Sequence, residues 1–344
     1  MKLVIQIPCL NEAEQLPATL ADLPRALPGF TAVEWLVIDD GSTDGTAEVA
    51  RAHGVDRVVS FPRNQGLATA FMTGLETALS MGADVIVNFD ADNQYRAENI
   101  PALVEPVRLG RASMAVGARP VRDIEHFSPL KRALQTLGSR IVRGLSGAMV
   151  DDAPSGFRAF DREAATKLYV FSRYTYTLET LIQAGRLNLA VASVPIKVNP
   201  PTRPSRLMRS MASYLWRSGA ILLRIFVLYY PLKAFSILAA IIAAPGLIAF
   251  LRFLIFYLQG EGGGHVQSLV IGAALLAVAA VLFVGGMIGD LIAANRVLLA
   301  EIRSRMLEEK IARIRGDAAT GRGAGAGAGA GMAEALETGR RSAP

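Results

Sequence analysis

The stretch "DVIVNFDADNQY" (residues 84–95) decides how this chain folds. Five largely apolar residues, 85–89, run directly into Asp90, a small residue, Asp92 and Gln94. A short apolar run rich in β-branched residues that stops at polar residues is typical of a buried strand. The pattern therefore predicts a strand over 84–90 that places two carboxylates, one residue apart, at its carboxyl end.

Comparable strand-like segments occur before this stretch, and each is followed by a helical pattern. Strands that alternate with helices favour parallel pairing through right-handed crossovers, which is the organisation of an α/β sheet. Ligands of such sheets bind beyond the carboxyl ends of the strands. The predicted strands cover 2–8, 33–40, 56–62 and 84–90, and the predicted helices cover 11–27, 47–54 and 64–82.

The composition separates an ordinary globular part from an apolar part. Of the 344 residues, 51% are hydrophobic and only 19% are charged, which exceeds the apolar content of typical soluble domains. The net charge of +6 has a local source, because the segment 203–233 carries arginines, one lysine and no acidic residue. Next to apolar segments, such a block favours an anionic membrane surface over nucleic acid. The single cysteine, Cys9, excludes an intrachain disulfide.

Two segments, 234–258 and 267–289, are almost continuously apolar. Each exceeds the roughly 20 residues that cross about 30 Å of hydrocarbon, whereas buried core helices of this length rarely lack a polar face. Their connection, 259–266, has no Lys or Arg, and both outer flanks are basic. The positive-inside bias therefore predicts a hairpin with both ends in the cytosol, in agreement with the lack of a recognisable signal peptide in "MKLVIQIP".

The predicted organisation has seven parts. They are a cytosolic domain (1–203), interfacial amphipathic helices (204–233), a first transmembrane helix (234–258), an external loop (259–266), a second transmembrane helix (267–289), a cytosolic helix (290–315) and a disordered Gly/Ala-rich tail (316–344). Gly285, Gly286 and Gly289 allow close helix packing, but small residues are common in membrane helices, so the oligomeric state stays open.

Polar residues follow the first two predicted strands as well. In "IPCLNE" (7–12), Glu12 can accept hydrogen bonds from a ribose or a base, but a helix cap is the simpler interpretation of this stretch alone. In "VIDDGSTDGT" (37–46), Asx-turns explain Ser42 and Asp44 but not two adjacent aspartates, Asp39 and Asp40, directly after an apolar strand.

"DADNQ" (90–94) suits a hard divalent cation. Asp90 and Asp92 can face the same crevice from a strand end, and Gln94 adds an amide oxygen. Such oxygen ligands suit Mg²⁺ or Mn²⁺, with positions left for water and phosphate oxygens. An Asp-rich surface turn explains this stretch, taken alone, equally well.

The joint order of these motifs resembles that of the family-2 glycosyltransferases. "IPCLNE", "VIDDGSTDGT", "RNQGLATAFMTGL" and "DADNQ" follow one another as in that family, and "SGFRAF" (155–160) and "TRPSRL" (202–207) continue the resemblance. With the paired apolar segments, the chain looks like the polyprenyl-phosphate (dolichyl-phosphate) sugar synthases. The resemblance implies a Rossmann-like nucleotide-sugar-binding domain of the glycosyltransferase A type, with a mostly parallel sheet, followed by interfacial helices and a two-helix transmembrane hairpin.

The resemblance also implies roles for individual residues. Asp92, Asp152 and Arg203 are the implied catalytic residues, and the metal ligands are Asp90, Asp92 and Gln94. The implied nucleotide-sugar contacts are Pro8, Leu10, Glu12, Ile38, Asp40, Asp90, Ala91, Asp92 and Arg119. The implied contacts of the acceptor phosphate are Lys131, Arg132, Ser155, Arg203 and Arg206.

Three positions depart from the family pattern. Leu10 stands where an aromatic residue is frequent, the loop at "RPSR" (203–206) is shorter and lacks the glycine of relatives, and Gly156 stands where some relatives carry an aspartate. A missing base is compatible with transfer to a phosphate monoester, whose second pKa near 6 makes it an anion at neutral pH. Arginines suit such an acceptor because their planar forks bind phosphate oxygens bidentately. Asp152 remains open as a base, an orienting group or a structural cap.

The expected function is metal-dependent, inverting transfer of a hexose-type sugar from a UDP- or GDP-linked donor to a polyprenyl or dolichyl phosphate. The expected protein is an integral, multi-pass protein of the cytoplasmic membrane, and transfer takes place at its cytosolic face. Alternatives are a membrane glycosyltransferase acting on a polysaccharide or glycolipid, and a non-catalytic nucleotide-binding membrane protein. A "QxxRW" motif, usual in processive synthases, is missing, since the tryptophans are Trp35 and Trp216. The sugar, the base of its carrier and the polyprenol length stay open.

Overall fold

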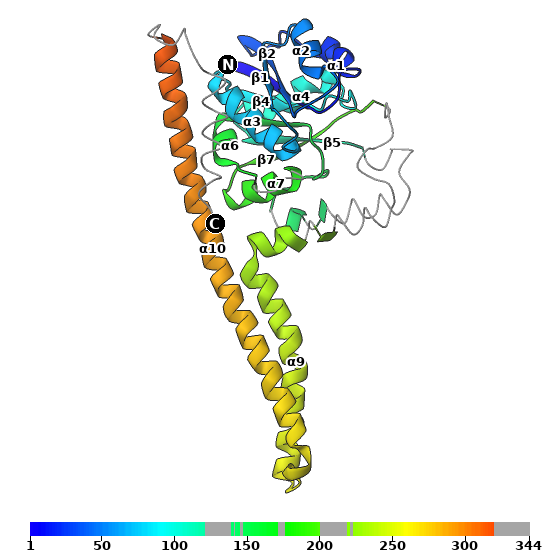
Figure 1. Ribbon diagram of the computed structural model, residues 1–344, viewed down its shortest axis with the longest axis vertical. Helices are drawn as coiled ribbons and strands as arrows, with labels where there is room; N and C mark the ends of the chain where they lie inside the picture. The colour runs from blue at the N-terminus through cyan, green and yellow to red at the C-terminus, as the bar shows by residue number, and fades with distance from the viewer. Residues whose placement is uncertain are drawn as a thin grey trace.

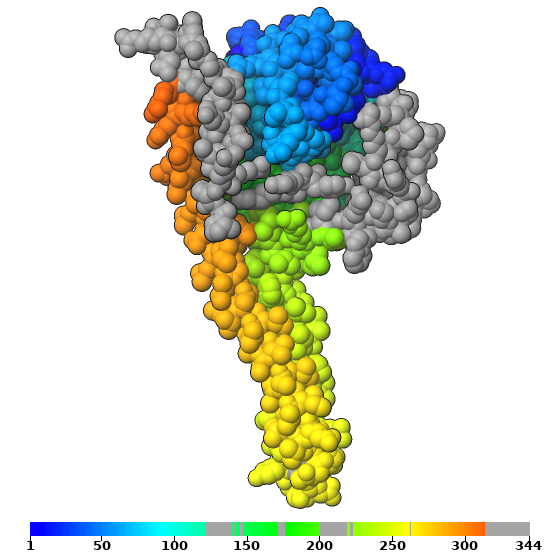
Figure 2. Space-filling model, viewed as in Figure 1, coloured from blue at the N-terminus to red at the C-terminus, as the bar shows by residue number. Residues whose placement is uncertain are grey.

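The computed structural model has an α/β domain from which a long helical hairpin extends (Figure 1). The space-filling view shows the hairpin as a narrow projection below the broad domain (Figure 2). The structure describes residues 1–120, 139–140, 142–144, 147–170, 176–199, 219–220 and 223–319.

The described part of the domain is built on a seven-stranded sheet with the order β3-β2-β1-β4-β6-β5-β7. Strands β1 to β4 pair in parallel, and β5 pairs in parallel with β7, while β6 is antiparallel to both of its neighbours. The prediction of a mostly parallel sheet is therefore confirmed. The strands are β1 (Lys2–Cys9), β2 (Ala32–Asp39), β3 (Arg57–Ser60), β4 (Val85–Asn88), β5 (Met114–Ala118), β6 (Arg158–Asp161) and β7 (Val191–Pro195).

Helices cover both faces of the sheet because alternate strand residues point to opposite sides. Val4 and Ile86 lie in one core with α3, α6 and α7, whereas Leu3 and Val85 lie in the other with α1 and α4. The helices of the domain are α1 (Leu16–Asp22), α2 (Thr46–Ala52), α3 (Leu67–Ser80), η1 (Ala97–Asn99), α4 (Ile100–Arg108), α6 (Arg162–Lys167) and α7 (Thr177–Arg186).

The helix predicted over 11–27 is shorter than the sequence pattern indicated. It begins only at Leu16, because Asn11 has a left-handed backbone (φ 54°) and the chain turns between Asn11 and Gln15. The turn places Asn11 and Glu12 beyond the carboxyl end of β1, next to residues that follow the neighbouring strand β2.

The two predicted apolar spans lie in two long helices, α9 (Pro231–Leu258) and α10 (Val266–Ala319), joined through η2 (Gly262–His265). Both helices are long and apolar enough to cross a membrane. Glycines bring them together within the chain: a Cβ at Gly272 would lie 2.9 Å from the Gly246 carbonyl oxygen, and one at Gly286 would lie 2.8 Å from Phe235 Cβ. Gly289 likewise faces Pro231, whereas Gly285 has open space around it.

α10 continues past the predicted span without a break. The segment 290–315, predicted as a separate cytosolic helix, is part of α10, which runs on to Ala319 into the predicted tail. Figure 1 shows this helix running up the side of the domain. Arg303 pairs with Glu76 of α3 and lies 4.6 Å from the centre of the Tyr169 ring, while Ile311 is buried in the domain core. The hairpin is therefore anchored on the domain by its second helix.

Candidate functional site

The two aspartates of the predicted metal site follow β4, as the sequence indicated. Asp90 is half-buried, and burial together with the nearby Asp92 carboxylate raises its pKa to about 7, against the opposing effect of Arg119 and Arg158. The Glu12 carboxylate raises this pKa too. These charged groups therefore come together from β1, β4, β5 and β6 at one edge of the sheet.

Local hydrogen bonds fix the turn that carries the aspartates. The Gln94 backbone N–H donates to Asp92 Oδ1 at 3.1 Å, an Asx-turn that Asn93 completes with a positive φ of 55°. The Thr19 hydroxyl of α1 donates to the Ala91 carbonyl oxygen at 2.8 Å. Ala91 is buried, so its position between the aspartates is set by packing against α1.

Arg119 and Asp152 form a bidentate ion pair beside Asp90. Arg119 Nε lies 2.6 Å from Asp152 Oδ2 and Nη2 lies 3.1 Å from Oδ1. Asp152 is fully buried, whereas the Arg119 side chain is 20% exposed. The buried carboxylate therefore holds a guanidinium group on a side chain that stays partly exposed, as an orienting group would.

Arg158, which the sequence did not single out, is the largest fully buried side chain of the site. Its guanidinium donates to the carbonyl oxygens of Ser155 (2.8 Å) and Ala153 (2.7 Å) and to the Thr180 hydroxyl (2.6 Å). Burial lowers its pKa to about 10. Arg158 thereby fixes the loop that leads through Ser155, a predicted acceptor contact that is itself fully buried.

A buried polar network sets the position of Gly156. The Asn88 amide donates to the Gly156 carbonyl oxygen (3.0 Å) and to the Tyr176 hydroxyl oxygen (2.8 Å), and the Gly156 N–H donates to the Tyr95 hydroxyl (3.1 Å). A Cβ at residue 156 would lie 2.8 Å from the Tyr176 oxygen and 3.1 Å from Asp90 Oδ2. The aspartate that some relatives carry here would therefore collide with this network.

Beyond β1 and β2, two turns are joined by hydrogen bonds. Asn11 Oδ1 accepts from the Thr43 N–H (2.9 Å), the Glu12 N–H donates to Thr46 Oγ1 (3.0 Å) and the Ala13 N–H donates to an Asp44 carboxylate oxygen (3.0 Å). The side chain of Glu12 is largely buried beneath these turns. Asp44 therefore has a structural task, which agrees with the Asx-turn interpretation.

The adjacent aspartates after β2 each organise a different turn. Asp39 accepts from the Ser42 N–H (2.9 Å), and Asp40 accepts from the N–H groups of Gln65 (2.7 Å) and Gly66 (3.0 Å) ahead of α3. Burial raises the pKa of Asp40, against those two hydrogen bonds. These hydrogen bonds explain why two consecutive aspartates follow β2, which the Asx-turn interpretation of the sequence did not explain.

The other predicted nucleoside contacts differ in accessibility. Pro8 lies buried in β1 and Ile38 lies fully buried in the core under α3, whereas Leu10 is half-buried at the end of β1. Ile38 therefore has no exposed side-chain surface in this structure. Four predicted phosphate contacts, Lys131, Arg132, Arg203 and Arg206, lie outside the described residues.

Within the described residues, no group of three or more His, Cys, Asp or Glu side chains is placed to hold a metal ion. The predicted set contains only two side chains of these types, Asp90 and Asp92, because its third member, Gln94, is an amide. Its role as a metal site stays a prediction.

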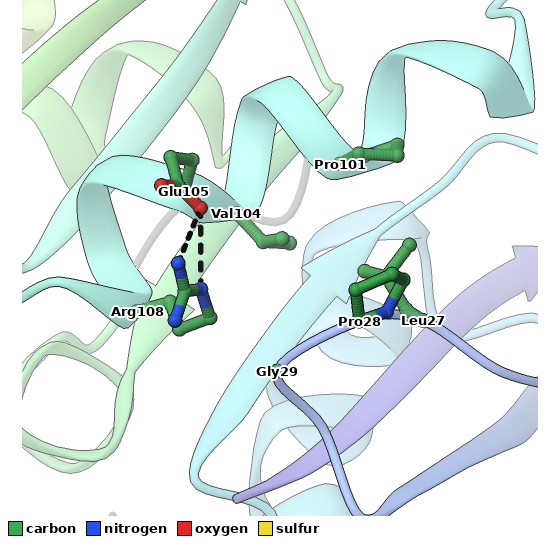
Figure 3. Close-up of a pocket in the computed structure, with 7 residues that line it drawn as sticks. All are labelled: Leu27, Pro28, Gly29, Pro101, Val104, Glu105 and Arg108. Atoms are coloured by element: carbon green, nitrogen blue, oxygen red, sulfur yellow. Dashed lines mark hydrogen bonds and ion pairs between the residues drawn. The ribbon is translucent and has the colours of Figure 1, made fainter.

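A shallow pocket of about 250 Å³ lies elsewhere in the domain (Figure 3). It is formed by the loop before β2 and one side of α4, where Arg108 bonds to Glu105 at 2.8 Å. None of the predicted site residues lines it. Because it adjoins the amino end of β2, it lies apart from the edge where the charged groups meet.

Comparisons with known proteins identify the family and the fold. Residues 4–168 match the model of the family described as Glycosyl transferase family 2. The chain is 30% identical to an undecaprenyl-phosphate mannosyltransferase of Micrococcus luteus, with 57% of this chain and 83% of that protein aligned. It is 31% identical to a UDP-N-acetylglucosamine–dolichyl-phosphate N-acetylglucosaminyltransferase of Methanococcus voltae, with 47% and 73% aligned.

The fold has a solved counterpart. The glucosyl-3-phosphoglycerate synthase of Mycobacterium tuberculosis, in a crystal structure with Mn²⁺, UDP-glucose and phosphoglyceric acid, superposes with a TM-score of 0.51 at 23% identity. The superposition covers 65% of this chain and 78% of that one. This likeness confirms the predicted glycosyltransferase A-type fold.

Proposed function

This chain belongs to glycosyl transferase family 2, and we propose that it transfers a hexose-type sugar from a nucleotide diphosphate to a polyprenyl or dolichyl phosphate. One observation carries the proposal. The Asp90–Asp92 pair and the Arg119–Asp152 pair meet at the carboxyl edge of the sheet, in a chain that also carries two membrane-length helices. The names of the two relatives support the class of acceptor.

The donor binds, in this proposal, across the carboxyl ends of β1, β2 and β4. The turn that contains Glu12 and the turn held by Asp40 border the nucleoside, and Arg119 faces the sugar diphosphate. A guanidinium suits that place because it carries five donors in a planar fork and keeps its charge. Asp152 uses two acceptors to aim that fork.

A divalent cation, Mg²⁺ or Mn²⁺, fits the donor set. Asp90 and Asp92 offer carboxylate oxygens close enough to influence each other electrostatically, and Gln94 is held in the same turn. Hard oxygen donors of this kind are those that both ions prefer. When bound, such an ion stabilises the charge that develops on the departing diphosphate.

The acceptor is proposed to react without a dedicated base. A phosphate monoester is already anionic at neutral pH, so one of its oxygens can attack the anomeric carbon directly. The new C–O bond forms opposite the bond to the departing diphosphate, and the configuration inverts. The chain's task is then to hold two anions together, for which Arg119 and the predicted cations Lys131, Arg132, Arg203 and Arg206 supply positive charge.

Transfer takes place, in this proposal, at the cytosolic face of a bilayer that α9 and α10 cross as a hairpin. The apolar length of both helices and the charge difference between the 259–266 connection and the outer flanks support this orientation.

The test uses the full chain in phosphatidylcholine nanodiscs with undecaprenyl phosphate and radiolabelled UDP- and GDP-sugars. We expect a labelled lipid product with one donor, loss of product on chelation, and recovery with Mg²⁺ or Mn²⁺. Nucleotide diphosphate release that is independent of lipid phosphate would contradict the proposed acceptor. Label in a polymer or a neutral glycolipid would favour the alternative acceptors.

A further inference from the structure

A second pocket lies at the junction between the domain and the hairpin. It lies between α6, α7, the helical residues 223–229 and α10, has a volume of about 40 Å³ and is lined mainly by apolar atoms. The side chains that matter to its chemistry are Lys167, Arg186, Arg296, Leu228 and Val297. None of the residues proposed for sugar transfer lines it.

Two arginines of this junction pocket come from different elements and bond neighbouring backbone carbonyls, while the nearby buried Glu179 carboxylate accepts from the Tyr229 hydroxyl at 2.9 Å. Arg186 of α7 donates to the Tyr229 carbonyl oxygen, and Arg296 of α10 donates to that of Leu228 at 3.1 Å. Within the described residues, neither guanidinium forms an ion pair. Lys167, in contrast, is neutralised by Glu163 at 2.7 Å.

Capping of the 223–229 helix explains only part of this arrangement. Basic side chains commonly bond the last carbonyls of a helix, and each arginine does so once. A guanidinium has five donors, however, so most donors of both side chains remain available. Two positive charges without an ion pair, beside a small pocket lined mainly by apolar atoms, favour a ligand that joins an anionic group to an apolar part.

The position of the junction pocket indicates where that anion comes from. Tyr230 directly precedes α9, and both Arg186 (5.5 Å) and Lys233 (5.2 Å) lie over its ring. Arg296 follows the apolar span 267–289 by two turns of α10. Aromatic and basic residues at the ends of apolar helices mark the membrane–water interface, and Val297, 42% exposed, adds an apolar wall.

We propose that this junction pocket binds the phosphate of an anionic phospholipid of the bilayer, with the acyl chains against the apolar surface of the hairpin. Basic pockets at the cytosolic ends of membrane helices bind anionic headgroups in this manner. The lipid would join α7 to α10 and so fix the domain on the membrane. This inference rests on the proposed membrane insertion of α9 and α10, but not on the proposed reaction.

The experiment compares full chains in nanodiscs of phosphatidylcholine alone and of phosphatidylcholine with phosphatidylglycerol. Native mass spectrometry counts the phosphatidylglycerol that each chain retains, and titration gives its affinity. Arg186→Gln with Arg296→Gln removes both charges but keeps a donor for each carbonyl. Arg305→Gln is the matched control, because Arg305 is 74% exposed on the same helix and pairs with Glu301.

A second pair of variants separates charge from folding. Val297→Glu and Val297→Lys place side chains of similar length and opposite charge at the same partly exposed position beside the pocket. We expect the glutamate to weaken phosphatidylglycerol retention by about fivefold or more and the lysine to preserve it, since one basic residue near an anionic surface contributes about that factor. The double glutamine variant should weaken retention further, and Arg305→Gln should leave it unchanged.

Every other outcome overturns the inference. Equal retention in all variants would mean that the lipid binds elsewhere, and equal effects of Val297→Glu and Val297→Lys would make the pocket structural. Displacement of phosphatidylglycerol by undecaprenyl phosphate would make it an acceptor site, and equal occupancy by inorganic phosphate would make it a site for a free anion. Failure to enter neutral nanodiscs would overturn the membrane hairpin as well.

Discussion

Asp152 binds Arg119 with both carboxylate oxygens, at 2.6 and 3.1 Å, and also accepts from the Arg119 backbone N–H at 3.3 Å. The aspartate lies 33 residues beyond its partner in the chain, in the loop before β6. A fully buried carboxylate engaged in this way is suited to hold a guanidinium rather than to collect a proton.

Asp152→Asn is expected to raise the KM for the sugar nucleotide and to lower kcat/KM by roughly 10- to 100-fold, because hydrogen bonds to charged groups contribute about 1.5–3 kcal/mol. Steady-state transfer assays measure this. Asp151→Asn is the control, since Asp151 is 72% exposed and pairs only with Arg143 and Ser193 in the described structure. A fall in kcat at constant KM, with loss of the acidic limb of the pH profile, would instead identify Asp152 as a base.

Asp92→Ala is expected to reduce transfer by about 100-fold or more, because a divalent cation stabilises the leaving group by several kcal/mol. The same variant should lose the quenching of intrinsic protein fluorescence that is expected when Mn²⁺ is titrated into the parent protein in the presence of nucleotide diphosphate. Glu98→Gln, at an exposed carboxylate in the following helix, should behave as the parent protein. Full turnover by Asp92→Ala, or by the parent protein after chelation, would refute the metal site.

Gly156→Ala is expected to destabilise the protein by about 1–3 kcal/mol, the usual cost of overpacking, since its Cβ would lie 2.8 Å from the Tyr176 oxygen. Thermal unfolding of the full chain measures the change. Gly144→Ala is the comparison, because its Cβ would meet nothing within 4 Å. Adding Tyr176→Phe should restore part of the loss at Gly156, and no interaction between the two changes would show that the contact is unimportant.

Arg303→Gln is expected to lower the unfolding free energy by about 1–2 kcal/mol, because it removes the ion pair with Glu76 and the contact with the Tyr169 ring. Arg305→Gln, two residues along α10, should stay within about 0.5 kcal/mol of the parent. A double-mutant cycle with Glu76→Gln isolates the pair. Additive effects would mean that the Arg303–Glu76 pair does not help to hold α10, which then depends on its other contacts, such as that of Ile311.

The sequence predicted those parts of the molecule that depend on local pattern. Strand periodicity identified the first four strands, and the abrupt change from Phe89 to Asp90 located the charged edge. The partnership of Arg119 with Asp152 could not be predicted, because it depends on how β5 and β6 pair. The family resemblance implied a role for each residue but did not indicate that the two bind each other.

The polar network around Gly156 left a signal that pattern analysis passed over. Gln6 and Asn88 lie among apolar neighbours in their strands, and each is fully buried. They bond to each other across the parallel β1–β4 pair at 2.9 Å. A buried amide requires a partner, so these two residues could have indicated a polar network beneath the site. Tyr176 and Arg158 had no comparable sign, because aromatic and basic residues at strand and helix ends are ordinary.

The single helix α10 also has a geometric consequence for how this chain can vary. Each residue of a helix advances the chain by about 1.5 Å along the helix axis and rotates it by roughly 100° about that axis. Because the apolar segment proposed to cross the bilayer and the segment bearing Arg303 share one helix axis, inserting a single residue between them would turn Arg303 away from Glu76. The distance between the charged edge of the sheet and the proposed membrane surface can therefore change only in steps close to whole helical turns.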